Sequence, residues 1–167
     1  YVSVPIQDRL VLRSRSEDDF TQEAELSAIN LGILMHLWLS RINTWQDAQP
    51  ALQQLIREGQ ITDKQALELN QQLNQLQQLI LQYNHNDWFT GNYQILSERD
   101  IFTPSGNIQR PDRVMIRNHH AIVIDYKFGQ QQLRSHTEQV RDYMALLSHM
   151  GYTTEGYLIY TALNKIQ

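Results

Sequence analysis

The stretch RPDRVMIRNHHAIVIDYKFG, residues 110–129, decides the fold of this chain. It contains two apolar runs, 113–116 and 121–128, on either side of the polar segment RNHH. Short apolar runs rich in β-branched residues and joined by a polar turn are typical of a β-hairpin. We therefore predict two antiparallel strands here.

Two carboxylates and an ammonium group are expected at one end of this hairpin. Successive side chains of a strand point to opposite faces, so Asp125 and Lys127 share a face at the end of the second strand. Asp112 begins the first strand and then lies beside them. Such charges suit a divalent cation, Mg²⁺ or Mn²⁺, with the lysine acting on a water or a phosphate. The alternative is a surface Asp125–Lys127 pair beside an ordinary turn aspartate.

Periodicity and capping residues predict the remaining elements. Helices are expected at 20–42, 44–57, 62–83 and 135–150, and strands at 93–102 and 156–161, with a TPSGN turn at 103–107. The first helix has the expected apolar stripe Leu26, Ile29, Ile33 and Leu37. This order of elements predicts an α/β or α+β fold with a mixed sheet.

The glutamine- and leucine-rich segment 62–83 carries a second stripe. Its members are Leu69, Leu73, Leu76 and Ile80. This spacing predicts a packing helix with an uncharged solvent face. A coiled-coil partner is the alternative, although the stripe lasts only about two heptads.

Composition limits the class of protein. The chain has 167 residues, 41% hydrophobic and 19% charged, and no cysteine, which excludes disulfides and thiolate metal sites and fits the cytoplasm. We find neither a signal peptide nor an apolar run long enough for a membrane span. The net charge of −4 disfavours a general nucleic-acid coat unless metal ions meet the phosphates. Because the chain begins with Tyr1, we expect a fragment of a longer protein.

The hairpin resembles the core of the PD-(D/E)XK nuclease superfamily. Pro111 and Asp112 match its PD motif, and Asp125, Tyr126 and Lys127 match its (D/E)XK motif. This resemblance implies a restriction-endonuclease-like α/β core, with a central mixed sheet flanked by helices. The domain then covers 20–167, with an added N-terminal helical region and an inserted 62–83 helix, after a strap or linker at 1–19.

The closer resemblance is to the RecB-like exonuclease branch, often found behind a UvrD-like helicase. Its further marks are a glycine four residues before a histidine (Gly32 and His36), a glutamine four before a tyrosine (Gln139 and Tyr143), and an acidic residue on the first core strand, for which Glu98 is the best match. It implies a Mg²⁺- or Mn²⁺-dependent DNA exonuclease in repair or recombination. A helicase domain in the same parent chain or complex, and a cytoplasmic, nucleoid-associated location, are also implied.

The resemblance also implies a role for each residue of the site. The implied catalytic residues are Asp112, Asp125 and Lys127. The implied metal ligands are His36, Asp112, Asp125 and the backbone carbonyl of Tyr126. The implied supporting residues are Glu98, Gln139 and Tyr143. The residues alone leave other interpretations open: His36 as a core histidine, Gln139 as a solvent-exposed glutamine, and Glu98 as a solvated acid that competes with Asp100.

Two other functions are compatible with parts of the sequence. A nuclease fold that has lost activity could serve in DNA binding or protein docking. The negative charge favours this alternative, and the intact Asp112, Asp125 and Lys127 disfavour it. A ligand-binding α/β domain lacks support, because no phosphate-cradling glycine loop occurs.

Three further residues lie near the expected site. Arg110 and Arg113 flank Asp112 and could meet phosphate, and His136 lies one turn before Gln139 on the same helix face.

Overall fold

A computed structural model describes the backbone of residues 17–97, 101–102 and 108–167, and the side chains of 27–96 and 110–167. The helices are α1 (Glu17–Leu39), α2 (Ala48–Arg57), α3 (Asp63–Gln82) and α4 (Arg134–His149), with short 3₁₀ turns at Trp45–Asp47 and Thr161–Leu163. The strands are β1 (Gln94–Ser97), β2 (Ile101–Phe102), β3 (Ile108–Gln109), β4 (Arg113–Arg117), β5 (His120–Lys127), β6 (Thr153–Tyr160) and β7 (Lys165–Ile166).

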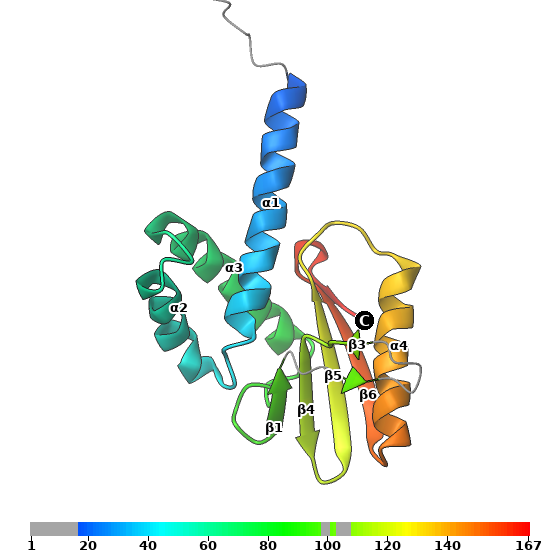
Figure 1. Ribbon diagram of the computed structural model, residues 1–167. Helices are drawn as coiled ribbons and strands as arrows, with labels where there is room; N and C mark the ends of the chain where they lie inside the picture. The colour runs from blue at the N-terminus through cyan, green and yellow to red at the C-terminus, as the bar shows by residue number, and fades with distance from the viewer. Residues whose placement is uncertain (1–16, 98–100, 103–107) are drawn as a thin grey trace, which may run out of the picture.

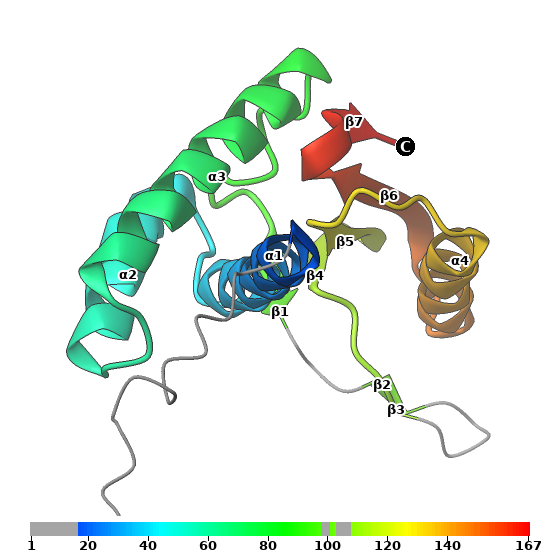
Figure 2. The ribbon, with the colours of Figure 1, turned by 90° about the horizontal axis from the view of Figure 1, so that it is seen from above.

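A five-stranded mixed sheet forms the centre of the domain (Figure 1). Its strand order is β1-β4-β5-β6-β7, in which only the β5–β6 pair is parallel. The parallel pair is connected through α4, as a crossover connection requires. Helices lie on both sides of the sheet (Figure 2). The predicted α/β fold with a mixed sheet flanked by helices is therefore confirmed.

The predicted hairpin is formed by β4 and β5. Arg113 pairs with Ile124, and Arg117 pairs with His120. The two turn residues Asn118 and His119 both have positive φ, 50° and 63°. Two residues with positive φ make the tight turn whose twist matches that of paired strands, and asparagine tolerates this conformation well. The short turn fixes the register.

The two faces of β5 pack on different helices. Ile122, Ile124 and Tyr126 belong to the core formed with α1, α2 and α3. Ala121 and Val123 belong to a second core under α4. Strand alternation predicts this division, and it places Asp125 and Lys127 on the α4 side.

The apolar stripe predicted for α1 is wrong at Ile29 and Ile33, and the side chain of Leu26 lies outside the described part. Ile29 and Ile33 are each 60% exposed, and among the described side chains of this helix, 27–39, those of Met35, Trp38 and Leu39 are buried.

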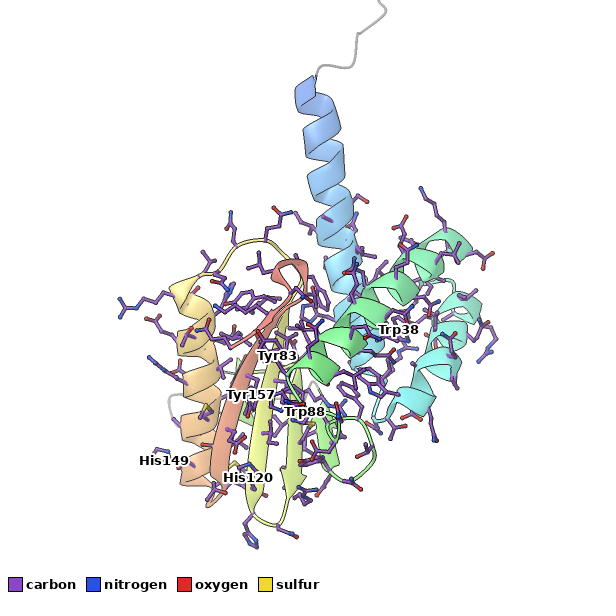
Figure 3. The ribbon with its side chains drawn as sticks, turned by 180° about the vertical axis from the view of Figure 1, so that it is seen from behind. Trp38, Tyr83, Trp88, His120, His149 and Tyr157 are labelled. Carbon is purple, nitrogen blue, oxygen red and sulfur yellow. The ribbon has the colours of Figure 1, made fainter. Side chains whose placement is uncertain are left out.

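The face of α1 that packs on the core carries Leu31, Leu34, Met35 and Trp38, so Ile29 and Ile33 lie on the opposite, outward face. The first turns of α1 extend beyond the sheet and the other helices (Figure 1). The last turns of α1 are deeply packed: Trp38 is fully buried among the helices, where its Nε1 donates to the carbonyl of Ala48 at the start of α2 (Figure 3).

Several boundaries also differ from the prediction. α1 begins at Glu17, so the last residues of the predicted 1–19 linker are helical, and it ends at Leu39. The predicted strand 93–102 is interrupted: β1 ends at Ser97, while β2 pairs with β3 in a separate two-stranded sheet. β7 was not predicted. The TPSGN turn lies outside the described residues.

The α2 and α3 segments follow their sequence signals closely. Thr62 caps α3 by accepting a hydrogen bond from the backbone N–H of Gln65. The four predicted stripe residues of α3 are all buried: Leu69, Leu73, Leu76 and Ile80. The packing-helix interpretation is confirmed. Among the described residues, no helix is both long and apolar enough to cross a bilayer.

Gly156 allows α4 to approach the sheet. A Cβ atom at this position of β6 would lie 2.5 Å from both Val140 Cγ1 and Met144 Sδ of α4. Real Cβ atoms do not approach other heavy atoms so closely. Any larger residue at position 156 must therefore displace the side chains of Val140 and Met144, or α4 itself.

We predict that Gly156→Ala lowers the free energy of unfolding by about 1–3 kcal/mol, because it overpacks the contact between α4 and β6. Urea unfolding followed by circular dichroism measures this. Gly129→Ala is the matched control, since a Cβ there meets nothing within 4 Å. Equal stability of the two variants would contradict the proposed close approach.

Candidate active site

The end of the β4–β5 hairpin holds two carboxylates and a lysine. Asp112 precedes β4, and its Oδ2 accepts a hydrogen bond of 2.8 Å from the backbone N–H of Tyr126 in β5. Asp125 is only 3% exposed, and its Oδ2 lies 2.6 Å from the Nζ of Lys127. The structure thus brings all three predicted catalytic residues to one end of the sheet.

His36 reaches the same place from α1. Its Nδ1 lies 3.1 Å from Oδ1 of Asp112, and its ring packs edge-on against Phe128 with centroids 5.1 Å apart. Gly32 lies one turn earlier, where an added Cβ would be 3.4 Å from the Cβ of Phe128. The helix therefore contacts the residue that follows β5 directly, and this contact sets the position of the imidazole.

Helix α4 contributes a hydrogen-bonded chain on the other side of Lys127. Lys127 Nζ donates to Gln139 Oε1 at 3.4 Å, and Gln139 Nε2 donates to the hydroxyl of Tyr143 at 2.9 Å. The Tyr143 hydroxyl donates in turn to the carbonyl of Arg110 at 3.1 Å. The predicted pair Gln139 and Tyr143 thus connects the lysine to the segment that carries Asp112.

Burial dominates the electrostatics of the acidic pair. It raises the pKa of Asp125 to about 6, with the charge of Asp112 adding to the rise and Lys127 opposing it. Burial also lowers the pKa of His36, but the hydrogen bond and charge of Asp112 outweigh it, so the pKa of His36 is raised overall. The carboxyl groups of Asp112 and Asp125 therefore concentrate negative charge at this site.

The donor atoms suit a divalent cation. Among the described residues, the buried Oδ2 of Asp125 receives no aligned hydrogen bond, although Lys127 is close. Two carboxylates and an imidazole are ligands that Mn²⁺ accepts, and the carboxylates suit Mg²⁺. As the described side chains stand, no three His, Asp or Glu residues are grouped closely enough to hold a metal ion. The residues fit a metal in chemistry, whereas their present spacing is that of ion pairs and hydrogen bonds.

Two predicted site features are not tested by the structure. Glu98, and its competitor Asp100, lie outside the described residues. Tyr126 lies in β5, but the metal-binding role of its backbone carbonyl stays a prediction.

The suggestion that Arg113 meets phosphate is wrong. Arg113 is 1% exposed and donates to the carbonyls of Ile42, Asn43 and Trp88 at 2.6, 2.7 and 3.3 Å. Its guanidinium also lies 4.0 Å from the ring centroid of Phe89. It anchors the start of β4 to the segment after α1, and so helps to set Asp112 near His36.

A signal for this anchoring role was present in the sequence. Arg113 and Met115 are two positions apart in the predicted strand, so their side chains share one face, and the apolar Met115 identifies that face as buried. A buried arginine must satisfy its five donors within the protein, so internal carbonyls are its expected partners.

Comparison with known proteins agrees with this geometry. The chain matches the PD-(D/E)XK nuclease superfamily, whose members are generally nucleases, over residues 8–166. A search of curated proteins gave no match. The matched region includes β4, β5, α1 and α4, the elements that carry the site. The chain therefore belongs to the PD-(D/E)XK nuclease superfamily.

Proposed function

We propose that this domain is a metal-dependent deoxyribonuclease that hydrolyses phosphodiester bonds. The observation that carries the proposal is the convergence of Asp112, Asp125 and Lys127 at the hairpin end, inside a chain of a nuclease superfamily. A strongly raised carboxyl pKa beside specific charge partners is typical of functional sites.

His36, Asp112, Asp125 and the carbonyl of Tyr126 would hold Mg²⁺ or Mn²⁺. When bound, such an ion polarises the phosphodiester and makes water a better nucleophile. Asp112 is held in place for this role by the N–H of Tyr126. The raised pKa of His36 is consistent with strong local negative charge that favours a cation.

Lys127 would orient the attacking water or stabilise negative charge on the phosphate. Its ammonium group is restrained between Asp125 and Gln139, and Gln139 is itself held by Tyr143. A restrained cation needs little reorganisation during reaction, which is the advantage of a preorganised site.

The finer assignment rests on resemblance to the RecB-like branch. The Gly32–His36 and Gln139–Tyr143 marks support an exonuclease that works with a helicase in DNA repair or recombination. The helicase would belong to the same parent chain or complex, and the location would be the cytoplasmic nucleoid. No P-loop motif occurs in this sequence, so the helicase is inferred from resemblance only.

An inactive module for DNA binding or protein docking is the second candidate. Two observations favour it: the net charge of −4, and the lack of a ready-grouped metal site among the described side chains. The candidates differ in cleavage and in metal binding.

We predict that Lys127→Ala and Asp125→Ala each lower the rate of DNA cleavage by roughly 10²–10³-fold, because the first removes the positive charge beside the reacting phosphate and the second removes a ligand of the metal ion. The assay uses linear single- and double-stranded DNA with Mg²⁺ or Mn²⁺. Lys64→Ala and Asp142→Asn are matched controls at exposed positions of α3 and α4. Cleavage that survives both site changes rules out this site.

We predict that the wild-type protein binds Mn²⁺ and that the double variant Asp112→Asn, Asp125→Asn does not, because amides replace the ionised ligands. Isothermal titration calorimetry measures the binding, with Asp142→Asn as the control. Absence of any Mn²⁺ binding by the wild type would favour the inactive module.

We predict that stability in metal-free buffer falls as the pH rises from about 4 to about 6. The pKa of Asp125 is 3.8 in the unfolded reference and about 6 in the folded protein, so the folded state holds more protons between these values. The free energy of unfolding then decreases by roughly 1–3 kcal/mol over this window. Urea unfolding at each pH measures it.

The variant Asp125→Asn isolates this effect. It lacks the ionisation, so its stability relative to wild type should improve across the same window. Parallel pH profiles of the two proteins would contradict the raised pKa of Asp125.

A further inference from the structure

A histidine outside the matched motifs lies beside Lys127. Tyr160 pairs with Lys127 across the parallel β5–β6 ladder. Paired residues of neighbouring strands are about 5 Å apart, and Tyr160 belongs to the core under α4, on the face that Lys127 shares. The Tyr160 hydroxyl is 3.1 Å from Nδ1 of His136 in the first turns of α4.

One ring nitrogen of His136 contacts the Tyr160 hydroxyl, and the side chain as a whole is partly exposed. Tyr160 is 1% exposed, whereas His136 is half-buried. Gln139, which contacts Lys127, lies three positions after His136, on the same face of α4. The imidazole therefore stands at the rim of the site, with the buried phenol behind it.

The pKa shifts of His136 and Tyr160 favour neutral forms of both side chains, in which each can donate a hydrogen bond. Burial and the charge of Lys127 lower the pKa of His136. Burial and the charge of Asp125 raise the pKa of Tyr160, so its phenol stays protonated at neutral pH. A protonated phenol can donate to Nδ1, which leaves the proton of the neutral ring on Nε2.

We infer that His136, oriented by Tyr160, binds a phosphate oxygen of the DNA strand on the α4 side of Lys127. The inference rests on the proposed nuclease function and adds a substrate-binding residue to it. Phosphate oxygens accept hydrogen bonds from neutral side chains as well as from cations, and such contacts fix the position of a strand. Lys127 then supplies the charge and His136 a directed hydrogen bond.

The test compares four single variants: His136→Ala, His136→Gln, Tyr160→Phe and His149→Ala. Gln keeps an N–H donor, and Phe removes the group that orients the ring. His149 is the matched control: it lies at the opposite end of α4, where its Nδ1 is 2.7 Å from the carbonyl of Ala145 (Figure 3). Thermal unfolding checks that each variant is folded.

Three quantities are measured with a fluorescent single-stranded oligonucleotide: KM and kcat of cleavage with Mn²⁺, and the dissociation constant by fluorescence anisotropy. His136→Ala should raise KM and the dissociation constant about tenfold, the size expected for a hydrogen bond to a charged group, with a smaller change in kcat. Tyr160→Phe should give part of this loss, His136→Gln should restore most of the affinity, and His149→Ala should match wild type.

The outcomes separate this inference from the proposed function. If wild type binds or cuts DNA and His136→Ala equals it, the inference alone is overturned. A loss of stability in His136→Ala with unchanged KM and affinity shows a packing histidine and also overturns it. If wild type neither binds nor cuts, both the inference and the nuclease proposal fall.

Discussion

The hydrogen bond from the N–H of Tyr126 to the carboxylate of Asp112 is the contact on which the site depends. It joins Asp112, the residue before β4, to Tyr126 near the end of β5. The two strands form a hairpin whose two-residue turn fixes their register. A shift of one residue would send Asp125 and Lys127 to the opposite face of the sheet. The geometry of the site is therefore a consequence of strand pairing, and the helices add to a frame that the hairpin sets.

The placement of Asp125 is difficult to explain by stability. Its carboxyl is almost fully buried, beside a second carboxylate, and burial raises its pKa. An apolar residue at this position would avoid the desolvation of a charge, and buried ion pairs seldom stabilise a fold more than apolar replacements do. The chain also commits Gln139 and Tyr143 to hold the neighbouring lysine. Groups that are unfavourable for folding and yet carefully positioned are the pattern expected of a site kept for chemistry.

Local signals in the sequence were enough for the hairpin, the α3 cap and the central order of elements, because turn, alternation and capping act between near neighbours. They failed where the outcome depended on what lies across the fold. The periodicity of α1 predicts an apolar face, but Ile29 and Ile33 remain exposed because the helix packs on the core through its other face, which carries Leu34, Met35 and Trp38. The short strands β2, β3 and β7 contain two residues each, which is too few to show a periodic pattern, although their partners are close in sequence: Ile101 pairs with Gln109, and Ile159 pairs with Ile166.

The candidate site was predictable in two steps of different kind. Alternation along β5 brought Asp125 and Lys127 together by geometry alone, whereas His36 and Gln139 were expected only through resemblance, since spacing along the chain gives no distance between helices. Asp125 and Lys127 share one face of β5, whereas Asp112 comes from the start of β4, His36 from α1 and Gln139 from α4. Alternation along one strand therefore accounts for the Asp125–Lys127 pair, and the rest of the site depends on how the hairpin partner and two helices pack around the end of β5.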